Sequence, residues 1–286
     1  MVAKRRGVSL IELLVAVTLL AVVAGAALRS LVALGRQSVA VSEHAAVQAG
    51  VRTGMMLVEA ELRGLGADAG DADLLQLGVD SITYRAPRGF GVTCALSANQ
   101  VRVRDGEPFR FSGLRAVAPG RDSLLLFVEG DSTSRLDDRW IRLPVYSVGS
   151  SSCGTVPAIA IGTGDLSALL AAGAALPLLP GGPVRTFEVV RIAEYQSGGE
   201  RWLGMASISG GEAIQPVAGP LVGAGLTVEY LGATGAPVVQ GSAVRQLRIA
   251  LVGAGDRAVG AAWTGRPAGA AVDSLLTRIT LRNVGR

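Results

Sequence analysis

The chain has 286 residues, of which 49% are hydrophobic, 4% aromatic and 17% charged, and 39 of them are glycine. This length accommodates one large domain or two small ones, and the many glycines suit a β-rich body with numerous turns. The formal net charge is +4, but Lys4, Arg5 and Arg6 supply three of these charges, so the residues after Gly7 carry only +1. With so small a charge and so few aromatic side chains, we do not expect a nucleic-acid partner.

An apolar segment follows the basic residues, and its only charged side chain is Glu12. The segment covers residues 8–28, close to the roughly 20 residues that a helix needs to cross a bilayer. The basic residues before it favour a cytoplasmic N-terminus and an exported body. A carboxylate at the centre of a spanning helix costs roughly 2.5–3.5 kcal/mol, and less near an end, so we interpret Glu12 as functional. The alternative is an ordinary secretory signal, cleaved at the small residues 24–27.

The helical pattern continues beyond the apolar segment. Val47, Val51, Met55, Val58 and Leu62 are spaced by four, four, three and four residues, which places them on one face of a helix. A cluster of glycines at positions 64, 66 and 70 predicts the C-terminal end of this helix. We therefore expect one helix from about residue 8 to about residue 65, roughly 85 Å long. The glycines at positions 25, 35, 50 and 54 are interpreted as weak points in it.

The rest of the chain reads as short strands separated by turns. Alternating or continuous apolar patterns predict strands at residues 81–85, 100–104, 123–128, 139–148, 185–195, 201–208, 226–231, 245–252 and 274–282. Pro144 favours an edge strand or bulge within residues 139–148. Residues 166–179 are rich in Ala and Leu and suit a short helix or an apolar insert. The predicted fold class is α+β: a long N-terminal α-helix, with a transmembrane half and an amphipathic half, packed on a predominantly antiparallel β-sheet head.

The N-terminal residues resemble the class III signal of type IV pilins and type II secretion pseudopilins. The resemblance rests on Gly7 followed by Val8-Ser9-Leu10-Ile11-Glu12-Leu13-Leu14-Val15. It departs from the family only at Val8, where the family most often has Phe but accepts other apolar residues. The resemblance implies that a prepilin peptidase cleaves between Gly7 and Val8 and methylates the new amine of Val8. It also implies that Glu12 serves assembly by pairing with the N-terminal amine of a neighbouring subunit.

The same resemblance implies a division of the chain and a set of partners. Residues 1–7 form a cytoplasmic leader that is removed, residues 8–66 form the long helix with its transmembrane part at about 8–28, and residues 67–286 form an exported β-rich head. The partners are the prepilin peptidase, other major and minor pilins that pack against the N-terminal helix, and an inner-membrane assembly platform. The expected location is the inner membrane, with a periplasmic head, and then a pilus or pseudopilus. No cofactor is expected.

Looser similarities in the body point to a subgroup of this family. Residues 56–63, 82–85, 225–230 and 277–283 resemble segments of PilW-type minor pilins and of J-type pseudopilins. The leading hypothesis is a minor pilin that helps to initiate or cap a type IV pilus, and the alternative is a J-type pseudopilin of a type II secretion system. More remote alternatives are a signal-anchored exported adhesin and a DNA-uptake pilin.

Few residues in the body suggest chemistry. The two cysteines, Cys94 and Cys153, would lie in an oxidising compartment, which favours a disulfide, although two buried free thiols remain the alternative. Asp131, Asp137 and Asp138 lie in an acidic loop that is a weak candidate for calcium, with a spacing that matches no EF-hand. His44 is the only histidine and falls within the predicted helix, so a catalytic triad is not expected. We therefore predict a protein that is not an enzyme.

Overall fold

A computed structural model describes residues 9–66, 72–129, 138–171, 180–259 and 269–282. The chain divides into two compact units. The first comprises Met1–Ala49 and Ala254–Asp273, and the second comprises Gly50–Gly253 and Ser274–Arg286. The long helix α1 (Leu10–Leu62) contributes residues to both.

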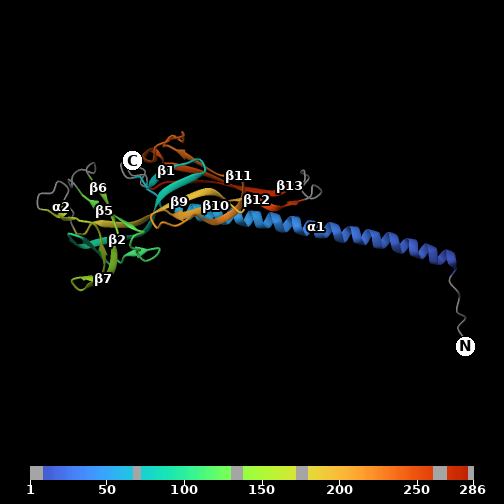
Figure 1. Ribbon diagram of the computed structural model, residues 1–286, viewed down its shortest axis with the longest axis horizontal. Helices are drawn as coiled ribbons and strands as arrows, with labels where there is room; N and C mark the ends of the chain where they lie inside the picture. The colour runs from blue at the N-terminus through green and yellow to red at the C-terminus, as the bar shows by residue number, and fades with distance from the viewer. Residues whose placement is uncertain (1–8, 67–71, 130–137, 172–179, 260–268, 283–286) are drawn as a thin grey trace, which may run out of the picture. The chain divides into compact units, whose positions relative to one another are not determined.

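The described part of the chain after α1 consists mostly of β-strands (Figure 1). The strands are β1 (Leu74–Leu77), β2 (Ser81–Ser97), β3 (Gln100–Arg104), β4 (Ser112–Gly113), β5 (Ser123–Val128), β6 (Arg139–Pro144), β7 (Ser147–Cys153), β8 (Val156–Gly162), β9 (Pro183–Ser197), β10 (Glu200–Ser207), β11 (Gln215–Leu231), β12 (Gln246–Val259) and β13 (Gly269–Thr280). Two short helices accompany them, α2 (Ser167–Leu170) and the 3₁₀ helix η1 (Gly241–Ala243).

These strands form one antiparallel sheet system. Its main order is β13-β12-β11-β10-β9-β2-β3-β8-β7, with β1 and β4 paired to β2, and β5 paired to both β6 and β9. Strand β2 joins the two parts of the system, because residues 81–92 pair with β9 whereas residues 93–97 pair with β3. A helix followed by an antiparallel sheet is the α+β fold that the sequence predicts.

In the first unit, one face of α1 is covered where the helix meets the chain after residue 253. Ala40 and Val47 are buried. A Cβ added at Gly255 would lie 3.3 Å from Val47 and 3.4 Å from Ala271, so this part of β12 approaches the helix and β13 closely. Within this unit, only the part of the helix from Ala40 onward contains buried residues, because residues 9–39 are exposed.

In the second unit, the amphipathic end of α1 packs against the sheet. Val51, Met55, Val58 and Leu62 are at most 4% exposed, as their spacing predicts. Gly54 lies on the same contact, and a Cβ placed there would come within 2.7 Å of the Ala218 Cβ. The helix is continuous through Gly54 and does not break there, and the missing side chain at this position lets the helix approach the sheet.

A second hydrophobic core lies away from the helix, within the part of the sheet system that contains β3, β5 and β8. Its fully buried members are Val101, Val103, Leu124, Leu126, Ile161, Leu166 and Val184. Leu166 immediately precedes α2, which covers only Ser167–Leu170 of the Ala- and Leu-rich segment. Residues 172–179 of that segment lie outside the described residues.

The single strand predicted at residues 139–148 is two strands. β6 ends at Pro144 and β7 begins at Ser147. Between them, the Val145 amide donates to the Asp122 carbonyl (3.2 Å), next to the paired residues Ser123 and Pro144. Because proline lacks an amide hydrogen, it suits a strand end better than a strand interior. Strand β7 consists mostly of serine and glycine, which carry little strand propensity, so its hairpin with β8 was not predicted.

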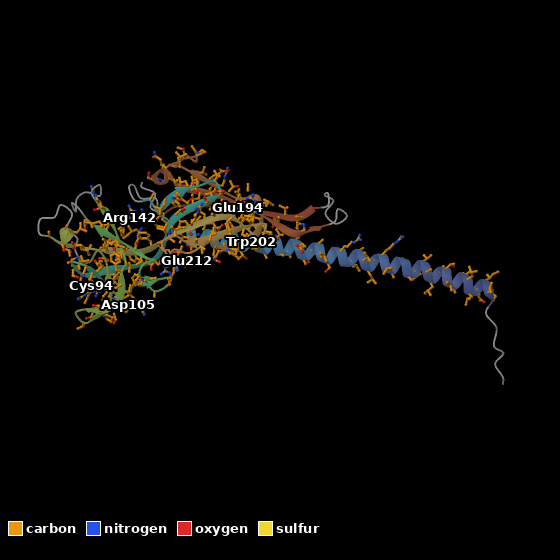
Figure 2. All side chains as sticks on the ribbon, viewed as in Figure 1. Cys94, Asp105, Arg142, Glu194, Trp202 and Glu212 are labelled. Atoms are coloured by element: carbon orange, nitrogen blue, oxygen red, sulfur yellow. A yellow bond between two sulfur atoms is a disulfide. The ribbon has the colours of Figure 1, made fainter. Side chains whose placement is uncertain are left out.

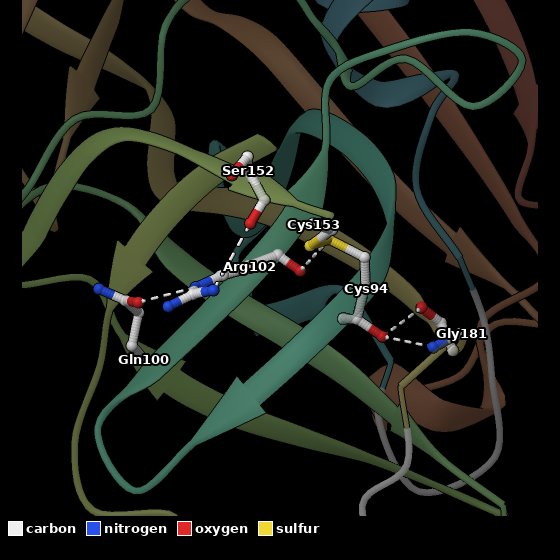
Figure 3. Close-up of a disulfide and its surroundings, with 8 residues drawn as sticks. Cys94, Gln100, Arg102, Ser152, Cys153 and Gly181 are labelled. Carbon is white, nitrogen blue, oxygen red and sulfur yellow. Dashed lines mark hydrogen bonds between the residues drawn. A yellow bond between two sulfur atoms is a disulfide. The ribbon is translucent and has the colours of Figure 1, made fainter. Parts of the chain in front are cut away.

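The two cysteines form a disulfide that links β2 to the end of β7 (Figure 3). Their Cα atoms are 6.1 Å apart. Beside the bond, Arg102 of β3 donates hydrogen bonds to the Gln100 side chain (3.3 Å) and to the Ser152 carbonyl (3.5 Å). The cross-link therefore connects strands that are separated in the sheet by β3 and β8.

Candidate functional site

The start of α1 is closed by a reciprocal pair of hydrogen bonds between Ser9 and Glu12. The Glu12 amide donates to Ser9 Oγ at 3.2 Å, and the Ser9 amide donates to Glu12 Oε2 at 3.4 Å. The Leu13 amide donates to the Ser9 carbonyl at 3.1 Å, which makes Ser9 the N-cap and Glu12 the third helical residue. This arrangement is a capping box, and it places a negative charge at the positive end of the helix dipole. The Ser-x-x-Glu spacing was a readable signal for it that our sequence analysis missed.

Large apolar side chains cover the helix that follows this cap, and they are exposed. An 18-residue window of α1 has a mean hydropathy of 2.5, and none of it is buried. Among the side chains between 47% and 80% exposed are Leu10, Ile11, Leu13, Leu14, Val15, Val17, Leu19, Leu20, Val22, Val23, Leu28, Leu31, Val32 and Leu34. Removing each such side chain from water is worth about 1.5–3 kcal/mol. The helix is long and apolar enough to cross a membrane.

The two residues of the predicted processing site lie outside the described residues. Gly7 and Val8 precede Ser9, where the described part of the chain begins. Glu12 is described and exposed, four positions after Val8. Cleavage, methylation and the assembly role of Glu12 stay predictions.

The second unit contains a cluster of buried charges around Glu188 of β9, whose side chain is 2% exposed. Arg88 of β2 donates to Glu188 Oε1, and Arg121 donates to Glu188 Oε2 at 2.5 Å. Ser207 Oγ also donates to Glu188 Oε2, at 2.8 Å. Arg115 reaches the same oxygen at 3.5 Å.

This cluster extends to the end of the long helix. Arg88 forms a two-pronged contact with Glu61 of α1, with nitrogen–oxygen distances of 3.0 and 3.3 Å. Tyr84 Oη donates to Glu61 Oε2 at 3.2 Å. On the outer side, Arg121 donates to Glu212 at 2.6 Å, and Figure 2 labels Glu212 near the middle of the strands. The cluster therefore connects α1, β2 and β9 through charged side chains and reaches β10 through the Ser207 hydroxyl.

Hydrogen bonds lower the pKa of Glu188 by more than burial raises it. Burial alone would raise the pKa of this carboxyl, but the hydrogen bonds from Arg121, Arg88 and Ser207 lower its pKa to about 2. At Tyr84, burial raises the pKa well above its ordinary value, and the neighbouring Glu61 carboxylate raises it further. Glu188 is thus charged and Tyr84 neutral at physiological pH, which suits a permanent structural contact.

The cluster offers no group that is poised for catalysis. Its carboxylates are each held by guanidinium groups. The Ser207 hydroxyl does donate to Glu188, but the lowered pKa of Glu188 makes this carboxylate a poor base for activating a nucleophile. Arg115 in addition holds Asp122 with contacts of 2.6 and 2.8 Å. Sequence patterns could not reveal this cluster, because its members are distant along the chain and meet only through strand pairing.

The acidic-loop candidate for calcium is only partly described. Asp131 and Asp137 lie outside the described residues, whereas Asp138 is described and its buried Oδ1 has no hydrogen-bond partner among the described residues. Across the described ranges, no group of three or more His, Cys, Asp or Glu side chains is arranged to hold a metal ion. A calcium site at this loop stays a prediction.

Comparison with known proteins identifies a family motif in the N-terminal segment. The family model for the prokaryotic N-terminal methylation motif matches residues 2–28. Comparison with curated proteins gave no match, and comparison with solved structures gave none. The matched segment contains the basic residues, Gly7, the capping box and the start of the exposed apolar helix, and together these features belong to a membrane-anchored protein with an exported body. Residues 2–28 therefore carry the class III prepilin signal, the N-terminal motif of type IV pilin-like proteins.

Proposed function

We propose that the chain is a PilW-like minor pilin that is incorporated into a type IV pilus and helps to initiate or cap its assembly. It acts without catalysis, as a subunit whose helix joins the filament and whose head occupies a specialised position. The observation that carries this proposal is the methylation motif at residues 2–28, which includes the start of an exposed apolar helix.

The apolar helix supports a role in a membrane and then in a filament. Its exposed side chains need a lipid or protein environment, and a bundle of identical or similar helices provides one after the membrane is left. In this proposal, a prepilin peptidase cleaves between Gly7 and Val8. The helix then begins almost at the mature N-terminus. Before cleavage, the basic leader holds this end in the cytoplasm.

Glu12 supports assembly through its charge. A carboxylate within an apolar bundle requires a cation or hydrogen-bond donors. Its hydrogen bond to the Ser9 amide uses one of its two oxygens. We propose that the other oxygen of Glu12 pairs with the methylated amine of Val8 on a neighbouring subunit.

The experiment that tests this role compares cells with and without the gene. Filaments sheared from the surface are probed with an antibody to the head, and piliation and secretion are measured in the deletion strain. Loss of surface pili, with a few copies of the head in wild-type filaments, supports the minor pilin. Intact pili with loss of a secreted enzyme would instead identify a J-type pseudopilin, and intact pili and secretion would overturn both.

A further inference from the structure

The second unit contains a cavity of about 490 Å³ whose walls are both basic and apolar. Residues of β2 and β9 line it, together with Leu125 of β5, residues 112–114, Gly64, Gly66, Asp73 and Arg282. Ligand pockets in proteins commonly have volumes of about 300–1,000 Å³, so this cavity is large enough for a small organic molecule or a chain end.

The charges on the cavity wall are unbalanced. Four arginines contribute, at positions 85, 88, 185 and 282, against one carboxylate, Asp73. Arg88 is neutralised behind the wall by Glu61 and Glu188. Arg185 stacks on the Trp140 ring at 4.6 Å and makes no ion pair with a carboxylate among the described residues. The wall therefore keeps an excess of positive charge after its internal pairs are counted.

One of these arginines, Arg85, is buried. Arg85 is only 5% exposed, and its guanidinium lies 5.7 Å from the centre of the Phe187 ring. It also donates to the Ala72 carbonyl at 3.4 Å. Arg85 therefore adds positive charge to the wall while its guanidinium is engaged by contacts within the protein.

The remaining walls are apolar and open at the rim. Phe90 and Leu114 line the cavity and are 50% and 80% exposed. Phe187 and Leu125 are buried deeper in the wall. A ligand that fits must therefore combine a negative group with an apolar body.

We propose that this cavity binds a carboxylate attached to an apolar group, such as the C-terminus of a polypeptide that ends in a large apolar residue. The guanidinium group of Arg185 receives the carboxylate, and Phe90 and Leu114 cover the apolar part. Asp73 also lines the cavity and reduces the positive charge of its wall, so one carboxylate, which can accept a two-pronged contact from a single guanidinium, is the expected anion.

The test uses the full chain in a neutral detergent and measures binding by calorimetry. The probes are N-acetylphenylalanine, its neutral amide, N-acetylglycine, phenyl phosphate, and an acetylated tetrapeptide with a C-terminal phenylalanine. We expect the acid to bind at least about tenfold more tightly than the amide and than N-acetylglycine. Added affinity of the tetrapeptide would identify a polypeptide end as the source of the carboxylate, and equal affinity would identify a small molecule.

Arginine variants locate the binding. Arg185→Gln and Arg282→Gln should each weaken N-acetylphenylalanine binding about tenfold or more. Arg191→Gln is the matched control, because Arg191 lies on the same strand as Arg185 but is exposed and outside the cavity. Thermal unfolding of each variant verifies the fold. Equal binding of acid and amide, tighter binding of phenyl phosphate, or unchanged binding in both arginine variants would overturn the proposal.

Discussion

Ser9 and Glu12 cap the long helix reciprocally, each donating its amide to the side chain of the other, at 3.4 and 3.2 Å. Glu12 therefore has a local role in starting the helix as well as the charge that an assembled filament would use. The two roles differ in what they require. A capping box accepts glutamine in place of glutamate, whereas an ion pair with an amine does not.

Substitution of Glu12 separates these roles. Glu12→Gln keeps the cap and removes the charge, and Glu12→Ala removes both. We expect both variants to be processed normally and to be nearly absent from filaments, because the missing charge leaves the Val8 amine of a neighbouring subunit without its partner. Quantitative blotting of sheared filaments and of membranes provides the measurement.

Ser9→Ala is the matched control for the cap. It removes one capping hydrogen bond, at a cost of about 1 kcal/mol, but leaves the Glu12 charge. We expect it to enter filaments at close to the wild-type level. Normal incorporation of Glu12→Gln would contradict the ion pair and leave capping as the function of Glu12.

Glu188 should contribute strongly to the stability of the second unit. Glu188→Gln removes the buried charge that faces Arg88 and Arg121, and we expect a loss of about 3 kcal/mol in the free energy of unfolding. Glu212→Gln alters an ion pair with the same Arg121 at an exposed position, and should cost less than about 1 kcal/mol. Denaturant unfolding of both variants tests this, and equal losses would show that burial of Glu188 is unimportant.

The lowered pKa of Glu188 predicts a specific pH dependence. Because folding lowers this pKa from 4.5 to about 2, the folded state is favoured wherever the carboxyl is ionised. The stabilisation, about 3 kcal/mol, is complete above pH of about 4.5 and is lost as the pH falls toward 2. Unfolding measured across this range should show a steeper acid loss for the wild type than for Glu188→Gln. Parallel curves would contradict the assignment.

The sequence predicted the parts of the fold that depend on local pattern. The helix spacing placed Val51, Met55, Val58 and Leu62 on the buried face. Alternation located the strand at 100–104, and a continuous apolar run located the strand at 123–128, both at their observed bounds. Strand β7 was not predicted because its serines and glycine follow no apolar pattern. Its position depends on pairing with β8. The Glu188 cluster was not predicted either. Arg88 and Glu188 are about 100 positions apart in the sequence, and local spacing does not indicate which distant residues pair.

Gly54 should be intolerant of any side chain. A Cβ there would lie 2.7 Å from Ala218 and 2.9 Å from Leu251, so Gly54→Ala should separate the helix from the sheet and cost about 1–3 kcal/mol. Gly35→Ala is the control, because nothing lies within 4 Å of its Cβ position. Thermal unfolding compares the two, and an unchanged midpoint for Gly54→Ala would show that the contact is looser than described.

Loss of the disulfide should destabilise the second unit. The bond closes a loop with a sequence separation of 59 residues between Cys94 and Cys153, for which chain entropy predicts about 4 kcal/mol. The double variant Cys94→Ser, Cys153→Ser should therefore unfold at lower denaturant concentration than the wild type. Reduction of the wild type should reproduce that shift, and the double variant should not respond to reductant.

The most direct test of the account is mass spectrometry of the mature N-terminus, with protein isolated from cell membranes. The account predicts a first residue of Val8 carrying one N-methyl group, and accumulation of the full-length precursor when the prepilin peptidase is deleted. An intact leader in wild-type cells, or a mature protein that begins after residues 24–27, would contradict it.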